Sequence, residues 1–205
     1  KEAAEAGADG ILLVTPYYNK GTQNGLIKHY TTITEEAKVP AILYNVPSRT
    51  GCSLAASTVA YLVKNAEYVT AIKEASGDIS HVADIMYACD GAIDLYSGND
   101  DQIVPILSLG GKGVISVLSN VAPKETHDIV ALFLEGKIKE SRELQLKALP
   151  LVHALFSEVN PIPVKAALNL MGKEVGPLRL PLTEMEAAHQ EVLVEEMKKF
   201  GIKLA

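Results

Sequence analysis

The stretch Tyr68-Val69-Thr70-Ala71-Ile72-Lys73-Glu74-Ala75-Ser76-Gly77 joins an apolar run of strand length directly to a lysine. Its apolar part, residues 68–72, lacks clean alternation of polar and apolar side chains, which is typical of a strand buried on both faces of a parallel sheet. Lys73 closes the run. The stretch therefore predicts a parallel sheet and places a candidate functional residue at the end of one strand.

Similar runs recur on both sides of this stretch, at Ile11–Val14, Ala41–Tyr44, Ile93–Tyr96 and Gly113–Leu118. Segments with apolar residues at every third or fourth position, typical of helices, lie between them at Leu26–Lys38, Leu54–Asn65, Ile79–Ala88 and Asp101–Leu109. The strand starts are 20 to 30 residues apart, which is the spacing of right-handed βα crossover units. The order predicts an α/β fold with a parallel sheet.

The chain changes character after Leu118, because four helix-like segments follow without another strong strand. These segments are residues 124–136, 141–157, 164–171 and 184–200. Pro163 is placed to open the third helix and Gly172 to close it. Thr183 and Glu186 form a capping-box pattern before the fourth. The C-terminal part is therefore predicted to be helical.

Repeat counting alone gives comparable weight to a (β/α)8 TIM barrel and to a doubly wound open sheet. The run Gly110–Gly113 follows a helix and precedes a strand, the reverse of a dinucleotide-binding loop, so we interpret it as a turn with positive φ. A complete barrel takes about 250 residues, so five βα units take about 155. The count favours strands 4 to 8 of a barrel with a C-terminal helical extension, divided into residues 1–136 and 137–205. The shortfall predicts that about 85 to 90 residues precede Lys1.

Composition and charge exclude several classes of function. The net charge is −6, from 19 basic and 25 acidic residues, and gives no basic footprint for nucleic acid or an anionic membrane surface. No apolar stretch approaches the roughly 18 to 20 residues of a membrane-spanning helix. The two cysteines, Cys52 and Cys89, show no pairing pattern, which suits a reducing compartment, and we expect a cytoplasmic protein. The five histidines are scattered without metal-ligand spacing, and no Gly-x-Ser-x-Gly elbow indicates a serine hydrolase.

Candidate catalytic residues lie where the predicted strands end, since catalytic groups of α/β barrels project from the C-terminal ends of the strands. Lys73 would lose solvent if it points into the barrel, which lowers its pKa and yields a neutral amine able to form a Schiff base with a carbonyl. Tyr44 ends the neighbouring strand, and its phenol is suited to proton transfer, with Tyr18 as a second relay member. Arg49 offers a bidentate partner for a carboxylate. Taken singly, each of these residues also has an ordinary structural interpretation.

Five ordered motifs resemble the dihydrodipicolinate synthase family of pyruvate-dependent class I aldolases. They are GILLVTPYYN at 10–19, YNVPSRTG at 44–51, IKEASG at 72–77, GGKGVISV at 110–117 and NPIPVK at 160–165. The resemblance implies a (β/α)8 barrel with a C-terminal helical region, in which the first three βα units of the family lie outside this sequence. It also implies a homotetramer, built as a dimer of dimers, and a reaction that needs no metal or organic cofactor.

The resemblance also implies roles for individual residues. Lys73 matches the lysine that forms an imine with pyruvate, and Tyr44 matches the proton donor and acceptor. Tyr18 matches a relay tyrosine that reaches a neighbouring subunit's site, and Arg49 matches the residue that binds the carboxylate of aspartate semialdehyde. Three further matches are Ile115 and Gly98, which line the pyruvate site, and Tyr17, at a position in the lysine-binding pocket of feedback-regulated members.

The leading interpretation is therefore a lyase that condenses pyruvate with L-aspartate 4-semialdehyde in lysine and diaminopimelate biosynthesis. A second is another pyruvate-dependent aldolase, such as a relative of N-acetylneuraminate lyase or a keto-sugar-acid aldolase. Arg49 weighs against it, because an arginine there suits a short acidic aldehyde better than a sugar. A third interpretation is a catalytically silent barrel fragment or binding module.

Overall fold

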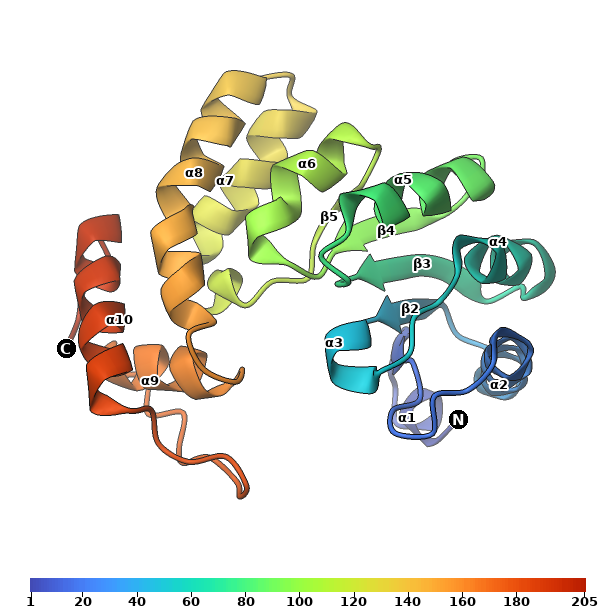
Figure 1. The fold of residues 1–205 in the computed structure, drawn as a ribbon, viewed down its shortest axis with the longest axis horizontal. Helices are drawn as coiled ribbons and strands as arrows, with labels where there is room; N and C mark the ends of the chain where they lie inside the picture. Colours follow the sequence, from blue (N-terminus) through green and yellow to red (C-terminus); the bar gives the residue numbers. More distant parts are fainter. The chain divides into compact units, whose positions relative to one another are not determined.

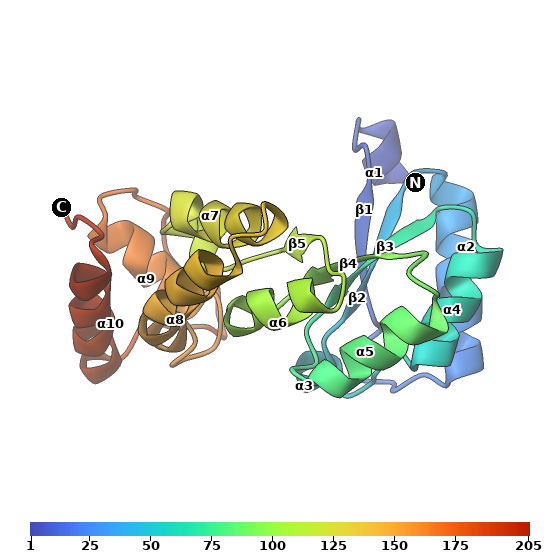
Figure 2. The same ribbon diagram turned by 90° about the horizontal axis from the view of Figure 1, so that it is seen from above.

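The computed structural model describes residues 1 to 205, which form two compact units, Lys1–Ile115 and Ser116–Ala205 (Figures 1 and 2). The first unit alternates strands and helices. Its elements are α1 (Glu2–Glu5), β1 (Ile11–Val14), α2 (Gln23–Ala37), β2 (Ala41–Asn45), α3 (Pro47–Thr50), α4 (Ala56–Asn65), β3 (Val69–Glu74), α5 (Ile79–Ala88), β4 (Asp94–Ser97), the 3₁₀ helix η1 (Asp100–Gln102), α6 (Ile103–Ser108) and β5 (Gly113–Val114).

The five strands form one parallel sheet in the order β1-β2-β3-β4-β5. A doubly wound sheet reverses its strand order at a switch point, whereas a barrel adds each new strand beside the previous one. The consecutive order therefore confirms the α/β prediction and selects the barrel arrangement over the open sheet.

Local signals account for the positions of the helices around these strands. Thr22 caps α2 by accepting a hydrogen bond from the amide of Gly25 (3.2 Å), and Asp78 caps α5 through the amides of Ser80 and His81 (2.9 and 3.2 Å). The buried residues of α2 are Leu26, Tyr30, Thr34 and Ala37. Their spacing of three and four places them on one helical face, which packs into the core.

The core of the first unit lies between the strands and helices α2, α4 and α5, which cover one face of the sheet (Figures 1 and 2). Leu43, Ile72 and Leu95 from β2, β3 and β4 belong to this core and are fully buried. Burying a side chain of this size stabilises a fold by about 1.5 to 3 kcal/mol. Because side chains alternate along a strand, the residues that follow these three point to the opposite face.

The pairing of β2 with β3 contains an irregularity that determines which residues meet. Ala41 pairs with Val69 and Tyr44 pairs with Lys73, so β2 advances three residues while β3 advances four. The extra residue, Thr70, is exposed and lies in a β-bulge. Val69 and Lys73 consequently occupy opposite faces, with Val69 in the core.

Three sequence predictions near residue 110 differ from the structure. Gly110 has φ +96°, as predicted, but Gly111 is required for space, since a Cβ there would lie 2.6 Å from Ile106 Cγ2. The strand predicted over residues 113–118 is only Gly113–Val114, because these two residues alone pair with β4, and a 3₁₀ helix follows at Leu118. The helix predicted over 101–109 is divided into η1 and α6.

The second unit is helical, as predicted. It contains the 3₁₀ helix η2 (Leu118–Asn120), α7 (Pro123–Leu134), α8 (Ile138–Leu155), α9 (Ile162–Leu170) and α10 (Ala187–Phe200). Gly172 follows α9 with φ +72°, but the predicted Thr183–Glu186 capping box is wrong. Glu186 is itself the N-cap residue of α10, and its amide donates to Glu158 Oε1 (2.9 Å), so a distant carboxylate replaces the local cap.

The compact units divide after Ile115, whereas counting by βα repeats divides the chain after residue 136. The difference is α7, which completes the fifth βα repeat in sequence and packs most extensively against α8. None of the helices combines the length and hydropathy of a membrane-spanning segment.

Candidate active site

A row of side chains on the face opposite the core contains the strongest candidates. The sheet register places Tyr44 beside Lys73 and Lys73 beside Tyr96, on β2, β3 and β4. All three stand near the C-terminal ends of their strands. Tyr96 is not among the residues predicted from the sequence, although it ends an apolar run as Tyr44 does.

Lys73 is held directly against Tyr44, with its Nζ 4.3 Å from the centre of the phenol ring. Burial lowers the pKa of the Lys73 amine, the carboxylate of Asp100 raises it, and the guanidinium of Arg49 lowers it further. The net direction is downward, which increases the share of neutral amine at a given pH. The desolvation expected for a lysine inside a barrel is therefore present, and the neutral amine is the nucleophilic form.

Tyr44 is suited to hold a proton beside this amine. Burial raises the pKa of its phenol, and the positive charge of Arg49 opposes the shift. The phenol therefore stays protonated at neutral pH and can donate its proton to a neighbouring oxygen or nitrogen. The same geometry lets the ring attract the ammonium form of Lys73.

Arg49 reaches this region because β2 leads directly into the short helix α3. Pro47 stands at its start, and Gly51 ends it with φ +68°. Thr50 Oγ1 donates to the carbonyl of Cys52 (2.8 Å), which stabilises the turn. Arg49 is exposed in the last turn of α3, and its charge acts on both Tyr44 and Lys73. An anion bound beside Lys73 would meet this charge.

Gly98 and Ile115 supply backbone at the same ends of the strands. The amide of Gly98 donates to the carbonyl of Glu74 (2.7 Å), and the amide of Ile115 donates to that of Ser97 (2.9 Å). A Cβ on Gly98 would lie 2.5 Å from Ala75 Cβ and 3.1 Å from Lys73 Cε. Ile115 lies one residue beyond β5, rather than within it as predicted.

Tyr17 and Tyr18 follow β1 in a loop and are 69% and 89% exposed. Tyr18 has φ +71°, an uncommon backbone conformation for a residue with a side chain. The structure thus places Lys73, Tyr44 and Arg49 together and leaves both tyrosines turned to solvent, so their roles stay predictions.

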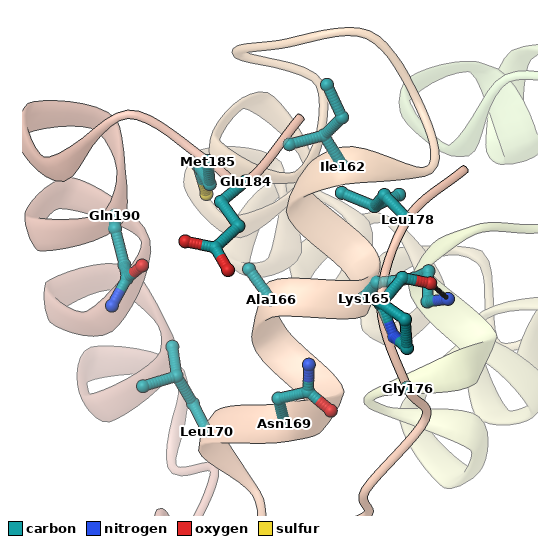
Figure 3. A pocket seen from close by; sticks show the side chains of 11 residues that line it. Ile162, Lys165, Ala166, Asn169, Leu170, Gly176, Leu178, Glu184, Met185 and Gln190 are labelled. Atoms are coloured by element: carbon teal, nitrogen blue, oxygen red, sulfur yellow. Dashed lines mark hydrogen bonds between the residues drawn. The ribbon is translucent and has the colours of Figure 1, made fainter. Parts of the chain in front are cut away.

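A cavity lies wholly within the helical unit and contains none of the predicted site residues. Its volume is about 360 Å³, and Lys165, Asn169, Glu184 and Gln190 supply its polar lining (Figure 3). Lys165 Nζ donates to the carbonyl of Pro177 (2.6 Å), so it fastens the loop after α9. No group of three or more His, Cys, Asp or Glu side chains is arranged to hold a metal ion.

Comparison with known proteins places this geometry in a family. Residues 1–200 match the model of the dihydrodipicolinate synthetase family. The 4-hydroxy-tetrahydrodipicolinate synthase of Lachnoclostridium phytofermentans is 62% identical over 202 residues, which are 98% of this chain and 69% of the relative.

Two solved structures extend the comparison. A monomeric dihydrodipicolinate synthase variant superposes with a TM-score of 0.96 at 43% identity, covering 98% of this chain and 68% of that one. The chloride-inhibited dihydrodipicolinate synthase of Acinetobacter baumannii, complexed with pyruvate, gives 0.94 at 41% identity, covering 98% and 69%. Sequence and fold agree over nearly the whole chain, which therefore belongs to the dihydrodipicolinate synthetase family.

Proposed function

We propose that this chain carries the catalytic lysine of a 4-hydroxy-tetrahydrodipicolinate synthase, a lyase that condenses pyruvate with L-aspartate 4-semialdehyde in lysine and diaminopimelate biosynthesis. The observation that carries the proposal is the contact between Lys73 Nζ and the Tyr44 ring, with burial lowering the lysine pKa and raising the tyrosine pKa. The relatives' names and the pyruvate complex of one of them support the choice of substrates.

The first half of the reaction activates pyruvate. The neutral amine of Lys73 adds to the keto carbon to give a carbinolamine, which loses its oxygen as water and leaves a protonated imine. Tyr44 supplies the proton that leaves with this oxygen. The positive nitrogen then withdraws electrons, so that the methyl group releases a proton to the phenolate of Tyr44, which restores the phenol, and an enamine forms.

The second half builds the product. The enamine carbon attacks the aldehyde carbon of aspartate semialdehyde, and a proton from Tyr44 converts the aldehyde oxygen into the 4-hydroxyl group. The amino group of the substrate then adds to the imine carbon and displaces the Lys73 amine, which closes the ring and releases the enzyme. Arg49 binds the carboxylate of the aldehyde substrate, and the backbone at Gly98 and Ile115 lines the pyruvate site.

The proposal extends to assembly and location. Tyr18 completes the proton relay of a neighbouring subunit, and its exposure in the single chain leaves it available for that contact. Tyr17 contributes to a lysine-binding pocket. The assembly is a homotetramer arranged as a dimer of dimers, and light scattering of the purified protein tests it against the monomer found for one relative. The unpaired, buried Cys52 and Cys89 fit a cytoplasmic location.

Borohydride trapping with pyruvate tests the central step. The whole natural polypeptide is incubated with pyruvate and reduced, and peptide mass spectrometry locates the adduct. We expect one reduced pyruvyl group, on Lys73, and none in Lys73→Arg. Lys64→Arg, which changes an exposed lysine of α4, is the matched control and should label fully.

Two outcomes contradict the proposal. An adduct on another lysine, or one that persists in Lys73→Arg, removes Lys73 from the mechanism. If pyruvate is trapped but aspartate semialdehyde is not consumed while a sugar-derived aldehyde is, the enzyme is a different pyruvate-dependent aldolase.

A further inference from the structure

A second row of side chains lies one position beyond the Tyr44–Lys73–Tyr96 row, on the opposite face of the sheet. The register pairs Asn45 with Glu74 and Glu74 with Ser97. Asn45 and Ser97 are fully buried, and Glu74 is 1% exposed. Burying polar and ionisable groups is costly unless each finds partners, so the contacts of this row identify its role.

Both carboxylate oxygens of Glu74 accept short hydrogen bonds. Oε2 accepts from Asn45 Nδ2 (2.8 Å), and Oε1 accepts from the amide of Ser76 (2.6 Å). His81 Nε2 lies 3.9 Å from Oε2. Glu74 therefore ties β3 to β2 and fixes the turn that leaves β3.

Asn45 extends the same connection to the loop that carries Arg49. Its Oδ1 accepts from the amide of Leu54 (2.9 Å), and its Nδ2 also donates to Ser53 Oγ (3.3 Å). Residues 46–53 thus leave β2 at Asn45 and return to the side chain of the same residue. Arg49 lies on this closed loop.

The covalent chain carries these constraints to the opposite face. Tyr44 directly precedes Asn45, and Lys73 directly precedes Glu74. The bond between the two buried side chains therefore holds together the backbone segments from which the phenol and the amine project. A displacement of about 1 Å in a reacting group can lower a rate by about 10²-fold.

We propose that Glu74 and Asn45 are positioning residues that fix the phenol, the amine and the guanidinium relative to one another. This inference rests on the proposed function, because it assigns the pair a role in imine formation at Lys73. Neither residue touches the reacting atoms. Each acts through its neighbour on the strand.

The test exchanges the carboxylate and the amide group between positions 74 and 45 and keeps the length of each side chain. Glu74→Gln replaces one acceptor by a donor, which must then face either Asn45 Nδ2 or the Ser76 amide. Asn45→Asp places a second carboxylate against Glu74. The double variant Asn45→Asp with Glu74→Gln restores complementarity, because the new amide group donates to the new carboxylate. That carboxylate still accepts from the amide of Leu54, and the carbonyl oxygen of the new amide still accepts from Ser76.

The readout is the rate of pyruvate trapping per folded site in the whole natural polypeptide. The maximum of each variant's pH profile is compared, so that a change in the pH at which Lys73 loses its proton does not count as a change in rate. We expect each single variant to trap about 10 to 100 times more slowly, in line with a sub-ångström to 1 Å displacement. The final extent of labelling should stay complete in every variant. On a logarithmic scale, the double variant should recover at least half of the trapping rate that the single variants lose.

Thr34→Val is the control for destabilisation alone. Thr34 is buried in α2 and bonds only to carbonyls of its own helix, so its loss should lower the unfolding midpoint without slowing trapping per folded site. If a single variant does not fold, Glu74→Asp replaces it, because it keeps the charge and retracts both oxygens by one methylene.

The results separate the two proposals. Slow trapping in folded single variants with recovery in the double variant supports the positioning role. Wild-type rates per folded site in Glu74→Gln, Asn45→Asp or Glu74→Asp overturn it, as does a double variant that folds and stays slow. If the unmodified protein forms no adduct, the proposed function itself is wrong and the positioning role is withdrawn with it.

Discussion

Adding a single methyl group at Gly98, the residue that follows β4, perturbs a close approach to the side chain of Lys73. The backbone of Gly98 does not have positive φ, so alanine carries no conformational penalty there and the effect is one of space. The new Cβ would lie 2.5 Å from Ala75 Cβ, 3.1 Å from the carbonyl oxygen of Glu74 and 3.1 Å from Lys73 Cε.

The size of the effect follows from these distances. Carbon atoms in ordinary contact are about 3.5 to 4.0 Å apart, so relieving the shortest contact requires a shift of about 1 Å. Ala75 Cβ has no torsion that can move it, so the backbone after β3 must move instead. Overpacking of this kind costs about 1 to 3 kcal/mol of folding free energy. The displaced Lys73 should trap pyruvate about 10²-fold more slowly.

Urea unfolding and borohydride trapping measure the two effects separately. Gly21→Ala is the control, because its Cβ would meet only Leu26 Cδ2, at an ordinary 3.8 Å. Combining Gly98→Ala with Ala75→Gly removes the 2.5 Å contact, so most of the lost stability and part of the rate should return. Gly98→Ala with wild-type stability and trapping rate would refute the close-approach argument. Lost stability with an unchanged rate per folded site would show that the shift does not reach Lys73.

Three further predictions concern charge, a buried hydroxyl and the helical unit. Trapping rises with pH as Lys73 loses its proton, and the charge of Arg49 lowers the pKa of Lys73, so Arg49→Met should move the pH profile of trapping to higher pH. Asp100→Asn should move the profile to lower pH, because the carboxylate of Asp100 raises the same pKa. A shift in the opposite direction in either variant contradicts the electrostatic account. Tyr30→Phe removes only long hydrogen bonds, to Thr15 Oγ1 (3.4 Å) and the Leu13 carbonyl (3.5 Å), and should cost about 0.5 to 1 kcal/mol in urea unfolding; a loss above about 2 kcal/mol would show a stronger role for the hydroxyl. Lys165→Met should accelerate amide hydrogen exchange in residues 173–183 and leave pyruvate trapping unchanged, whereas unaltered exchange means that the bond to Pro177 does not hold the loop.

The arrangement of strands follows largely from the sequence, because apolar runs and their spacing report the burial of each strand. The same patterns place Lys73 and Tyr44 at strand ends, and desolvation lowers the pKa of the lysine as expected. The predicted ends of the strands are less accurate. Residues 115–118 are as apolar as a strand, yet β5 ends at Val114, since pairing with β4 and not hydropathy determines its length.

The buried polar row was not predicted, because Asn45 and Glu74 resemble ordinary loop-proximal polar residues in sequence. Their burial depends on pairing between strands 29 residues apart and on the return of the loop to Leu54. Tyr96 was missed for a related reason, since its position beside Lys73 is a property of the register. Register is a tertiary property, and hydropathy alone does not encode it.

The bulge at Thr70 has a consequence for how β3 tolerates changes in length. β3 advances four residues between Val69 and Lys73 where β2 advances three, so β3 contains one residue more than regular pairing needs. A chain shortened by one residue between these two positions can pair as a regular strand and still place Val69 in the core and Lys73 beside Tyr44. A chain lengthened by one must widen the bulge or turn either the valine or the lysine to the wrong face. Deletions in this segment should therefore preserve the site more often than insertions, an asymmetry that guides both engineering of the strand and its natural drift.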